Sequence, residues 1–191
     1  MIFKAYHATD ESNVKDILEN GFIYYPNPRH WLGNGAYFFI DPGLAFLWCV
    51  ENSSSYGEIK NGVVLIVTIE TDDEFTLDLR LIDNFNDLKK LYATYVEFCK
   101  IVCQKNKKYV NPNDHERFRS SFFNWLIQKK SIQCIIAYIN TRDDVLQGTS
   151  SCKNDFEKMD IGYHEVQVCV SQLHCIKERK IFEKEGDFNE I

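Results

Sequence analysis

Strand-like and helix-like apolar patterns follow one another in a fixed order along this chain, and that order constrains the fold most. Short runs rich in β-branched and aromatic residues lie toward both ends of the 191-residue sequence, and residues 63–67 predict a buried central strand. Between these runs, apolar residues recur at helical spacing over 83–104 and 114–128. We therefore expect an α+β fold, with a β-sheet, flanking helices and a helical insertion at about 82–130.

The remaining elements are predicted from local signals. Asp10 suits the N-cap of a helix that Gly21 ends, and Pro42 suits the first turn of another helix. The polar stretch 140–163 predicts a long loop. No linker or repeat divides the chain, so we expect residues 1–191 to form one domain. Further strands are expected at 2–7, 22–25, 36–40, 76–79, 132–139, 165–170 and 174–182.

Composition limits the compartment and the class of protein. The chain is 45% apolar and 26% charged, and no apolar run approaches the roughly 18 residues that a membrane helix needs. Its first residues lack the pattern of a secretory signal, so we expect a cytoplasmic protein without a membrane partner. The chain has seven cysteines, an odd count that argues against a disulfide framework, and their spacing is not that of a zinc site. We therefore expect free, buried thiols and no bound metal.

The formal charge of −6 is unevenly distributed. Residues 100–130 hold six lysines and two arginines against two acids, a local charge of +6, which leaves −12 for the rest. Two interpretations stay open. The basic stretch 100–130 is either a solvated helix surface or a nucleic-acid contact, with Tyr109, Phe118 and Trp125 interleaved among the cations.

Three motifs could carry chemistry. His7 ends a predicted strand and is followed by Ala8 and Thr9, small residues that let a flat ligand approach the backbone. Tyr37 begins a strand after a Gly-Asn-Gly turn that leaves space for a ligand, and its ring can stack on a planar, electron-poor ring. The alternatives are a structural histidine and a core aromatic side chain.

The third motif is a strand that begins with Glu165. Alternation puts Glu165, Gln167 and Cys169 on one face and three valines on the other. The valine face should pack on the core, and the other face should line a cleft and present a carboxylate and an amide. The alternative is an exposed acid on an edge strand.

In order and spacing, these motifs resemble the ADP-ribosyltransferase family in its His-Tyr-Glu branch, which includes the poly(ADP-ribose) polymerases and diphtheria-toxin-like enzymes. The resemblance implies that family's split β-sheet, mixed or antiparallel, and NAD as substrate. It implies that His7 binds the adenosine ribose, that the Ala8 backbone holds the nicotinamide carboxamide, and that Tyr37 stacks on nicotinamide. The family usually has glycine where this chain has Ala8.

The same resemblance implies roles for further residues. Trp48, or its rival Leu47, would close the second face of nicotinamide, and Arg29 or His30 would reach the pyrophosphate. Thr9 and Gly35 would complete the NAD site. Glu165 would stabilise the ribose cation in catalysis, with Gln167 positioning the acceptor, and the loop before Glu165 would select the acceptor through Gly148, Ser150 and Gly162.

The implied function is an NAD-dependent mono-ADP-ribosyltransferase, a glycosyltransferase that acts as a bacterial toxin or antiviral-defence effector, with a neutralising antitoxin as a further partner. The acceptor stays open between protein and nucleic acid. Two alternatives remain: a non-catalytic NAD-binding or partner-binding module on the same fold, and an NAD glycohydrolase that transfers ADP-ribose to water.

Overall fold

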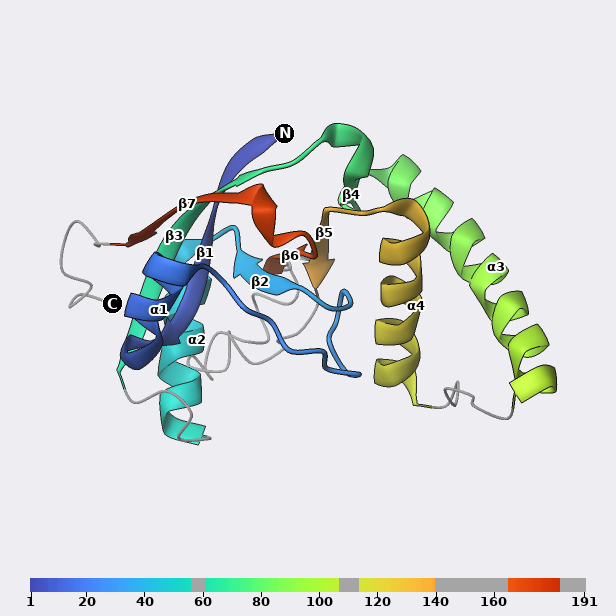
Figure 1. The fold of residues 1–191 in the computed structure, drawn as a ribbon, viewed down its shortest axis with the longest axis horizontal. Coiled ribbons are helices and arrows are strands. Elements are labelled where there is room, and N and C mark those ends of the chain that lie inside the picture. Colours follow the sequence, from blue (N-terminus) through green and yellow to red (C-terminus); the bar gives the residue numbers. More distant parts are fainter. Residues whose placement is uncertain (56–60, 107–113, 140–164, 183–191) are drawn as a thin grey trace, which may run out of the picture.

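The computed structural model describes residues 1–55, 61–106, 114–139 and 165–182, and its strands form one mixed sheet (Figure 1). The strand order is β4-β5-β6-β2-β1-β3-β7, in which β4 and β5 are parallel and the other neighbours antiparallel. This confirms the expected α+β class. The strands are β1 Ile2–Asp10, β2 Ala36–Phe39, β3 Gly62–Glu70, β4 Thr76–Asp78, β5 Cys134–Ile139, β6 Glu165–Val170 and β7 Ile176–Ile181.

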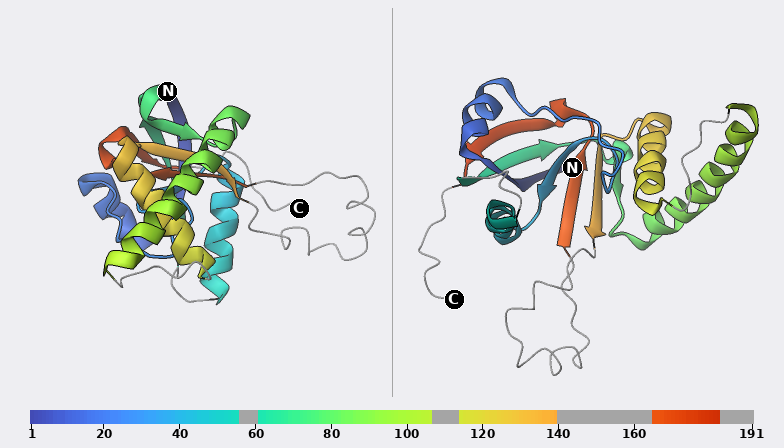
Figure 2. Two further views of the ribbon diagram at one scale, coloured as in Figure 1. Left: turned by 90° about the vertical axis from the view of Figure 1, so that its right-hand side faces the viewer. Right: turned by 90° about the horizontal axis from the view of Figure 1, so that it is seen from below.

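Helices cover both faces of the sheet. Asp10 caps the first helix by accepting a hydrogen bond from the Ser12 N–H, and Gly21 ends it at a φ of +92°, as the sequence predicts. Figure 2 shows the two helices of the predicted insertion side by side at one end of the molecule, beyond β5. The helices are α1 Glu11–Asn20, α2 Pro42–Ser55, α3 Ile82–Asn106 and α4 His115–Lys130, with short 3₁₀ turns at Asp73–Phe75 and Leu173–Cys175.

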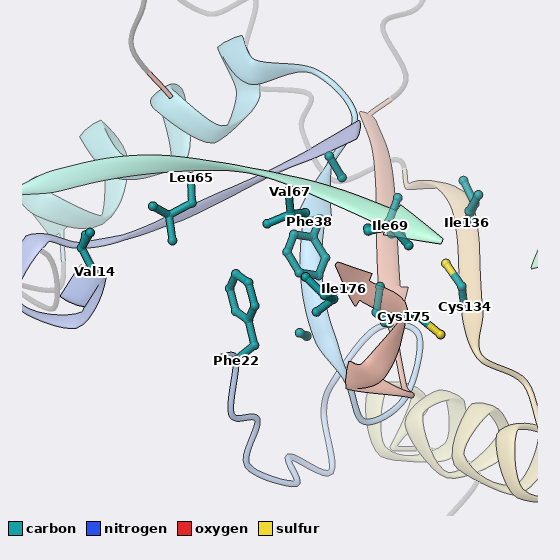
Figure 3. Close-up of a cluster of buried hydrophobic side chains, with 14 residues drawn as sticks. Val14, Phe22, Phe38, Leu65, Val67, Ile69, Cys134, Ile136, Cys175 and Ile176 are labelled. Atoms are coloured by element: carbon teal, nitrogen blue, oxygen red, sulfur yellow. The ribbon is translucent and has the colours of Figure 1, made fainter. Parts of the chain in front are cut away.

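The main apolar cluster fills the face of the sheet that α1 covers (Figure 3). Val168 and Val170 belong to this cluster, whereas Cys169 belongs to a second cluster on the opposite face, beneath α4. The alternation predicted for β6 is therefore confirmed, although Cys169 is packed in a core and does not line a cleft. A third, smaller cluster joins α2 to β1 and β3.

The strand predicted at 22–25 is wrong, because residues 21–27 have no regular secondary structure. Phe22 packs in the main cluster with its ring centroid 4.9 Å from that of His7. The predicted strands at 132–139 and 174–182 each begin two residues later than expected.

The sheet opens between β1 and β2. Strand β1 pairs with β3 from Ile2 to Asp10, but it pairs with β2 only at Tyr6 and Phe39. Beyond that pair, the side chain of His7 replaces the backbone ladder, with Nδ1 2.8 Å from the Tyr37 carbonyl oxygen. This opening lies in the interior of the sheet, with only β2 between it and β6.

Candidate functional site

A cavity of about 400 Å³ lies where β1 and β2 diverge. Small-molecule sites in proteins commonly measure about 300–1,000 Å³. Three strands, one helix and one loop contribute to its wall. The lining residues are His7 and Ala8 of β1, Tyr37, Phe38 and Phe39 of β2, Gln167 of β6, Trp48 of α2, and Asn27, Arg29, His30 and Trp31 of the loop before β2.

His7 reaches this cavity through the opening between the strands. Its ring contacts those of Phe22 and Phe38, so the side chain comes from the face opposite to Tyr37. Burial lowers the pKa of His7, against the opposing effect of the hydrogen bond to Tyr37. A neutral imidazole can meet a carbonyl oxygen only through an N–H, so Nδ1 carries the proton and Nε2 is an acceptor. His7 is therefore set to accept a hydrogen bond from a ligand hydroxyl.

Tyr37 uses its hydroxyl inside the protein. The hydroxyl donates to the Gly33 carbonyl at 2.7 Å and accepts from the Leu32 N–H at 2.8 Å. Burial raises the pKa of Tyr37, so the hydroxyl stays protonated. A ligand in the cavity can therefore meet the ring of Tyr37 but finds its hydroxyl already engaged. The His30 ring lies 5.2 Å from the Tyr37 ring, at 51°.

Glu165 adjoins the cavity without lining it. Its side chain is 4% exposed, and the Gln167 amide, which does line the cavity, donates a hydrogen bond to Glu165 Oε1. Both residues share the face of Tyr37, because Gln167 pairs with Phe39 and Cys169 pairs with Tyr37. The structure therefore brings His7, Tyr37 and Gln167 to one cavity, and Gln167 links the carboxylate to it.

The remaining predicted residues divide into two groups. Ala8, Trp48 and Arg29 line the cavity, whereas Leu47 does not. Thr9 is buried and accepts a hydrogen bond from Asn13, and Gly35 packs so tightly on β6 that a Cβ would lie 2.6 Å from the Val170 carbonyl oxygen. These two positions support the site from outside the cavity. The acceptor-loop residues Gly148, Ser150 and Gly162 lie outside the described residues.

Hydrogen bonds join the loop that lines the cavity to α4, and the sequence did not predict this contact. Asn124 Oδ1 accepts from the Asn34 N–H at 2.7 Å, and Ser120 Oγ donates to the Asn27 carbonyl at 3.3 Å. One signal was available. Ser120 and Asn124 are polar residues four positions apart within a run rich in aromatic residues, and such a pair shares one helix face.

At least one aromatic residue of the basic stretch is not free to stack on nucleic acid. Phe118 is 5% exposed and lies in the second cluster, and Lys129 covers the Trp125 ring at 4.6 Å. Tyr109 lies outside the described residues. Phe118 therefore cannot contribute to a surface in 100–130 that stacks on nucleic acid bases.

Five cysteines are free thiols: Cys49, Cys134, Cys169 and Cys175 are buried and Cys99 is half-buried. Burial raises the pKa of Cys169 to about 12, so this thiol stays protonated. Over residues 1–55, 61–106, 114–139 and 165–182, no cluster of three or more His, Cys, Asp or Glu could hold a metal ion. Within the same residues, no helix has the length and apolar character to span a membrane.

Comparison with known proteins adds little to this geometry. No family model matches the sequence, and no solved structure matches the chain. An uncharacterized protein of Methanocaldococcus jannaschii is 28% identical over 94 residues, which are 47% of this chain and 44% of that protein. The chain thus matches less than half of this relative, and the similarity assigns no activity to either protein.

Proposed function

We propose that this protein is an NAD-dependent mono-ADP-ribosyltransferase of the His-Tyr-Glu type, and that its opened sheet corresponds to the split sheet of that family. The observation that supports this most is the shared cavity of His7, Tyr37 and Gln167, with Glu165 bound to Gln167. These residues come from three strands and lie up to 160 positions apart in the sequence. Their order along the chain is the one that the resemblance requires.

The proposed binding mode uses the described contacts. His7 Nε2 accepts a hydrogen bond from a ribose hydroxyl, because Nδ1 is held by Tyr37. The rings of Tyr37 and Trp48, both on the cavity wall, enclose the nicotinamide. Beyond Tyr6, β1 has no ladder partner on its β2 side, so backbone groups near Ala8 can bind the carboxamide.

The proposed reaction breaks the bond between the nicotinamide nitrogen and C1′ of the ribose. The bonding electron pair leaves with nicotinamide, which neutralises the pyridinium, and positive charge develops on the ribose as in glycoside hydrolysis. The Glu165 carboxylate stabilises that charge, and its burial strengthens the interaction. A nucleophile of the acceptor then bonds to C1′ and releases its proton to water.

We further propose a protein as the acceptor, because Phe118 of the basic stretch is buried and Trp125 is covered by Lys129. A cytoplasmic role as a toxin or defence effector, with an antitoxin as partner, follows from the resemblance alone. Modification of purified RNA or DNA would contradict the choice of a protein acceptor.

Incubation with NAD labelled in its ADP-ribose part tests the function. The proposal predicts label in protein from a cell lysate and release of nicotinamide. Free ADP-ribose as the main product would identify a glycohydrolase. Unchanged NAD, with measurable NAD binding, would identify a non-catalytic binding module.

A further inference from the structure

Arg119 of α4 carries an unpaired guanidinium beside the cavity. Its Cζ lies 3.8 Å from the centroid of the Trp31 ring, and Trp31 lines the cavity. Its Nε and Nη2 atoms are shielded from solvent and have no hydrogen-bond partner in the part of the chain that the structure describes. Buried N–H groups are nearly always paired, so two unpaired donors on one cation need an explanation.

Nearby acids do not supply the missing partner. Glu116, one turn earlier on α4, lies 3.6 Å from the Nε of Arg29, and Asp114 pairs with Arg117 at 3.3 Å. Among the described residues, Arg119 therefore has no ion-pair partner. Burial accordingly lowers the pKa of Arg119, and the charge of Glu116 only partly opposes this. Burying a cation without a counter-charge is unfavourable, and a bound anion would remove that cost.

A second unpaired group lies on the cavity wall itself. The Nδ1 atom of His30, the neighbour of Trp31 in sequence, is also shielded from solvent and without a hydrogen-bond partner. Burial lowers the pKa of His30, and a contact with the Asn34 side chain opposes that shift. His30 thus lines the cavity directly, and Arg119 adjoins it through the ring of Trp31, the next residue in sequence.

This arrangement is held in place before any ligand arrives. Ser120 and Asn124, on the same helix as Arg119, bind the loop at Asn27 and Asn34. The loop and the helix that carries Arg119 are therefore fixed relative to each other, and the Trp31 ring of the loop lies against the guanidinium. Preorganised donors of this kind are what tight anion binding requires.

We propose that Arg119 and His30 form an anion subsite that binds a phosphate group of a nucleotide held in the cavity. The planar fork of a guanidinium suits bidentate binding of phosphate oxygens, and aromatic stacking suits arginine better than lysine. The identity of the nucleotide as NAD rests on the proposed function, but the binding of phosphate does not.

Calorimetry on the full chain with adenosine, ADP and inorganic pyrophosphate tests the subsite. Wild-type protein should bind ADP at least tenfold more tightly than adenosine. Arg119→Gln should lose about tenfold to a hundredfold in affinity for ADP and pyrophosphate, with adenosine binding unchanged. Arg117→Gln, two positions away and exposed, is the matched control and should bind all three as the wild type does.

Several results would overturn the subsite. These are equal ADP and adenosine affinities in the wild type, ADP binding unchanged by Arg119→Gln, or equal losses in the Arg117 and Arg119 variants. If Arg119→Gln fails to fold, Arg119→Lys replaces it, and ADP affinity equal to that of wild type would count against the bidentate contact. If Arg119→Gln loses ADP affinity but the wild type does not cleave NAD, the subsite is supported and the proposed function is contradicted. If the wild type cleaves NAD but Arg119→Gln binds ADP as the wild type does, the proposed function is supported and the subsite is contradicted.

Discussion

At the scale of single residues, His7 is a buried imidazole whose protonation the fold opposes. Its pKa lies below the ordinary value of 6.5 because of burial, so below that pH the unfolded chain binds a proton that the folded chain does not. The free energy of unfolding should therefore fall as the pH drops below about 6.5, by at most about 1.4 kcal/mol per pH unit from this group.

The comparison is between wild type and His7→Asn, which keeps a donor toward the Tyr37 carbonyl but does not titrate. Denaturant unfolding at pH 7.5, 6.5, 5.5 and 5.0 should show a steeper loss of stability for the wild type. Parallel pH dependences for the two proteins would mean that His7 is not held neutral.

Tyr37 has a hydroxyl with a structural role and a ring with a proposed role in binding, and removing the hydroxyl alone separates the two. Tyr37→Phe leaves the Leu32 N–H and the Gly33 carbonyl without their partner, which should cost about 1–3 kcal/mol of unfolding free energy. The ring remains, so NAD affinity of the folded variant should stay close to that of wild type. Tyr25→Phe, at a tyrosine that is 79% exposed, should change stability by less than about 0.5 kcal/mol. Identical urea midpoints for the two variants would contradict the hydrogen-bond account.

At the scale of elements, the entry to β2 depends on Gly35. A Cβ there would lie 2.6 Å from both Cys169 Sγ and the Val170 carbonyl oxygen, and a neighbouring backbone cannot move aside cheaply. Gly35→Ala should therefore destabilise the protein by about 1–3 kcal/mol. In α2, a Cβ at Gly43 meets only the Asp41 side chain, so Gly43→Ala should be neutral or slightly stabilising. Thermal unfolding of the pair tests this, and equal melting temperatures would contradict it.

Local signals predicted most elements but not how they meet. The bounds of α1 follow from Asp10 and Gly21, and the alternation of β6 follows from its sequence, because caps and periodicity are local. The contact between Asn34 and Asn124 joins residues 90 positions apart, and no local pattern encodes it. The same holds for His7, which reaches the cavity only because β1 and β2 diverge.

At the scale of the whole molecule, the strand order explains why the candidate site lies where it does. Strand β2 lies between β1 and β6, so residues from both ends of the chain meet beside Tyr37. Helix α2 adds Trp48, and α4 of the insertion holds the loop wall. The insertion is thus part of the architecture of the site. Periodicity predicted its two helices, whereas its contact with the cavity depends on side-chain packing across the fold.

The proposed function depends most on the Glu165 carboxylate, which in our proposal drives cleavage of NAD in this cavity. Glu165→Gln keeps the shape and can still accept the hydrogen bond from Gln167, but it lacks the negative charge. In the proposed mechanism the carboxylate acts mainly in the transition state, so NAD affinity should change little while nicotinamide release slows by about 10²–10³. Glu178→Gln, on the exposed edge strand β7, is the control and should behave as wild type.

The deciding measurement is single-turnover release of nicotinamide from NAD by wild type, Glu165→Gln and Glu178→Gln, beside NAD affinity by calorimetry for the same proteins. We predict near-equal affinities for all three and a slow release only for Glu165→Gln. Release at the wild-type rate by Glu165→Gln would contradict the account, because the carboxylate would then be a structural partner of Gln167 and not a catalytic group.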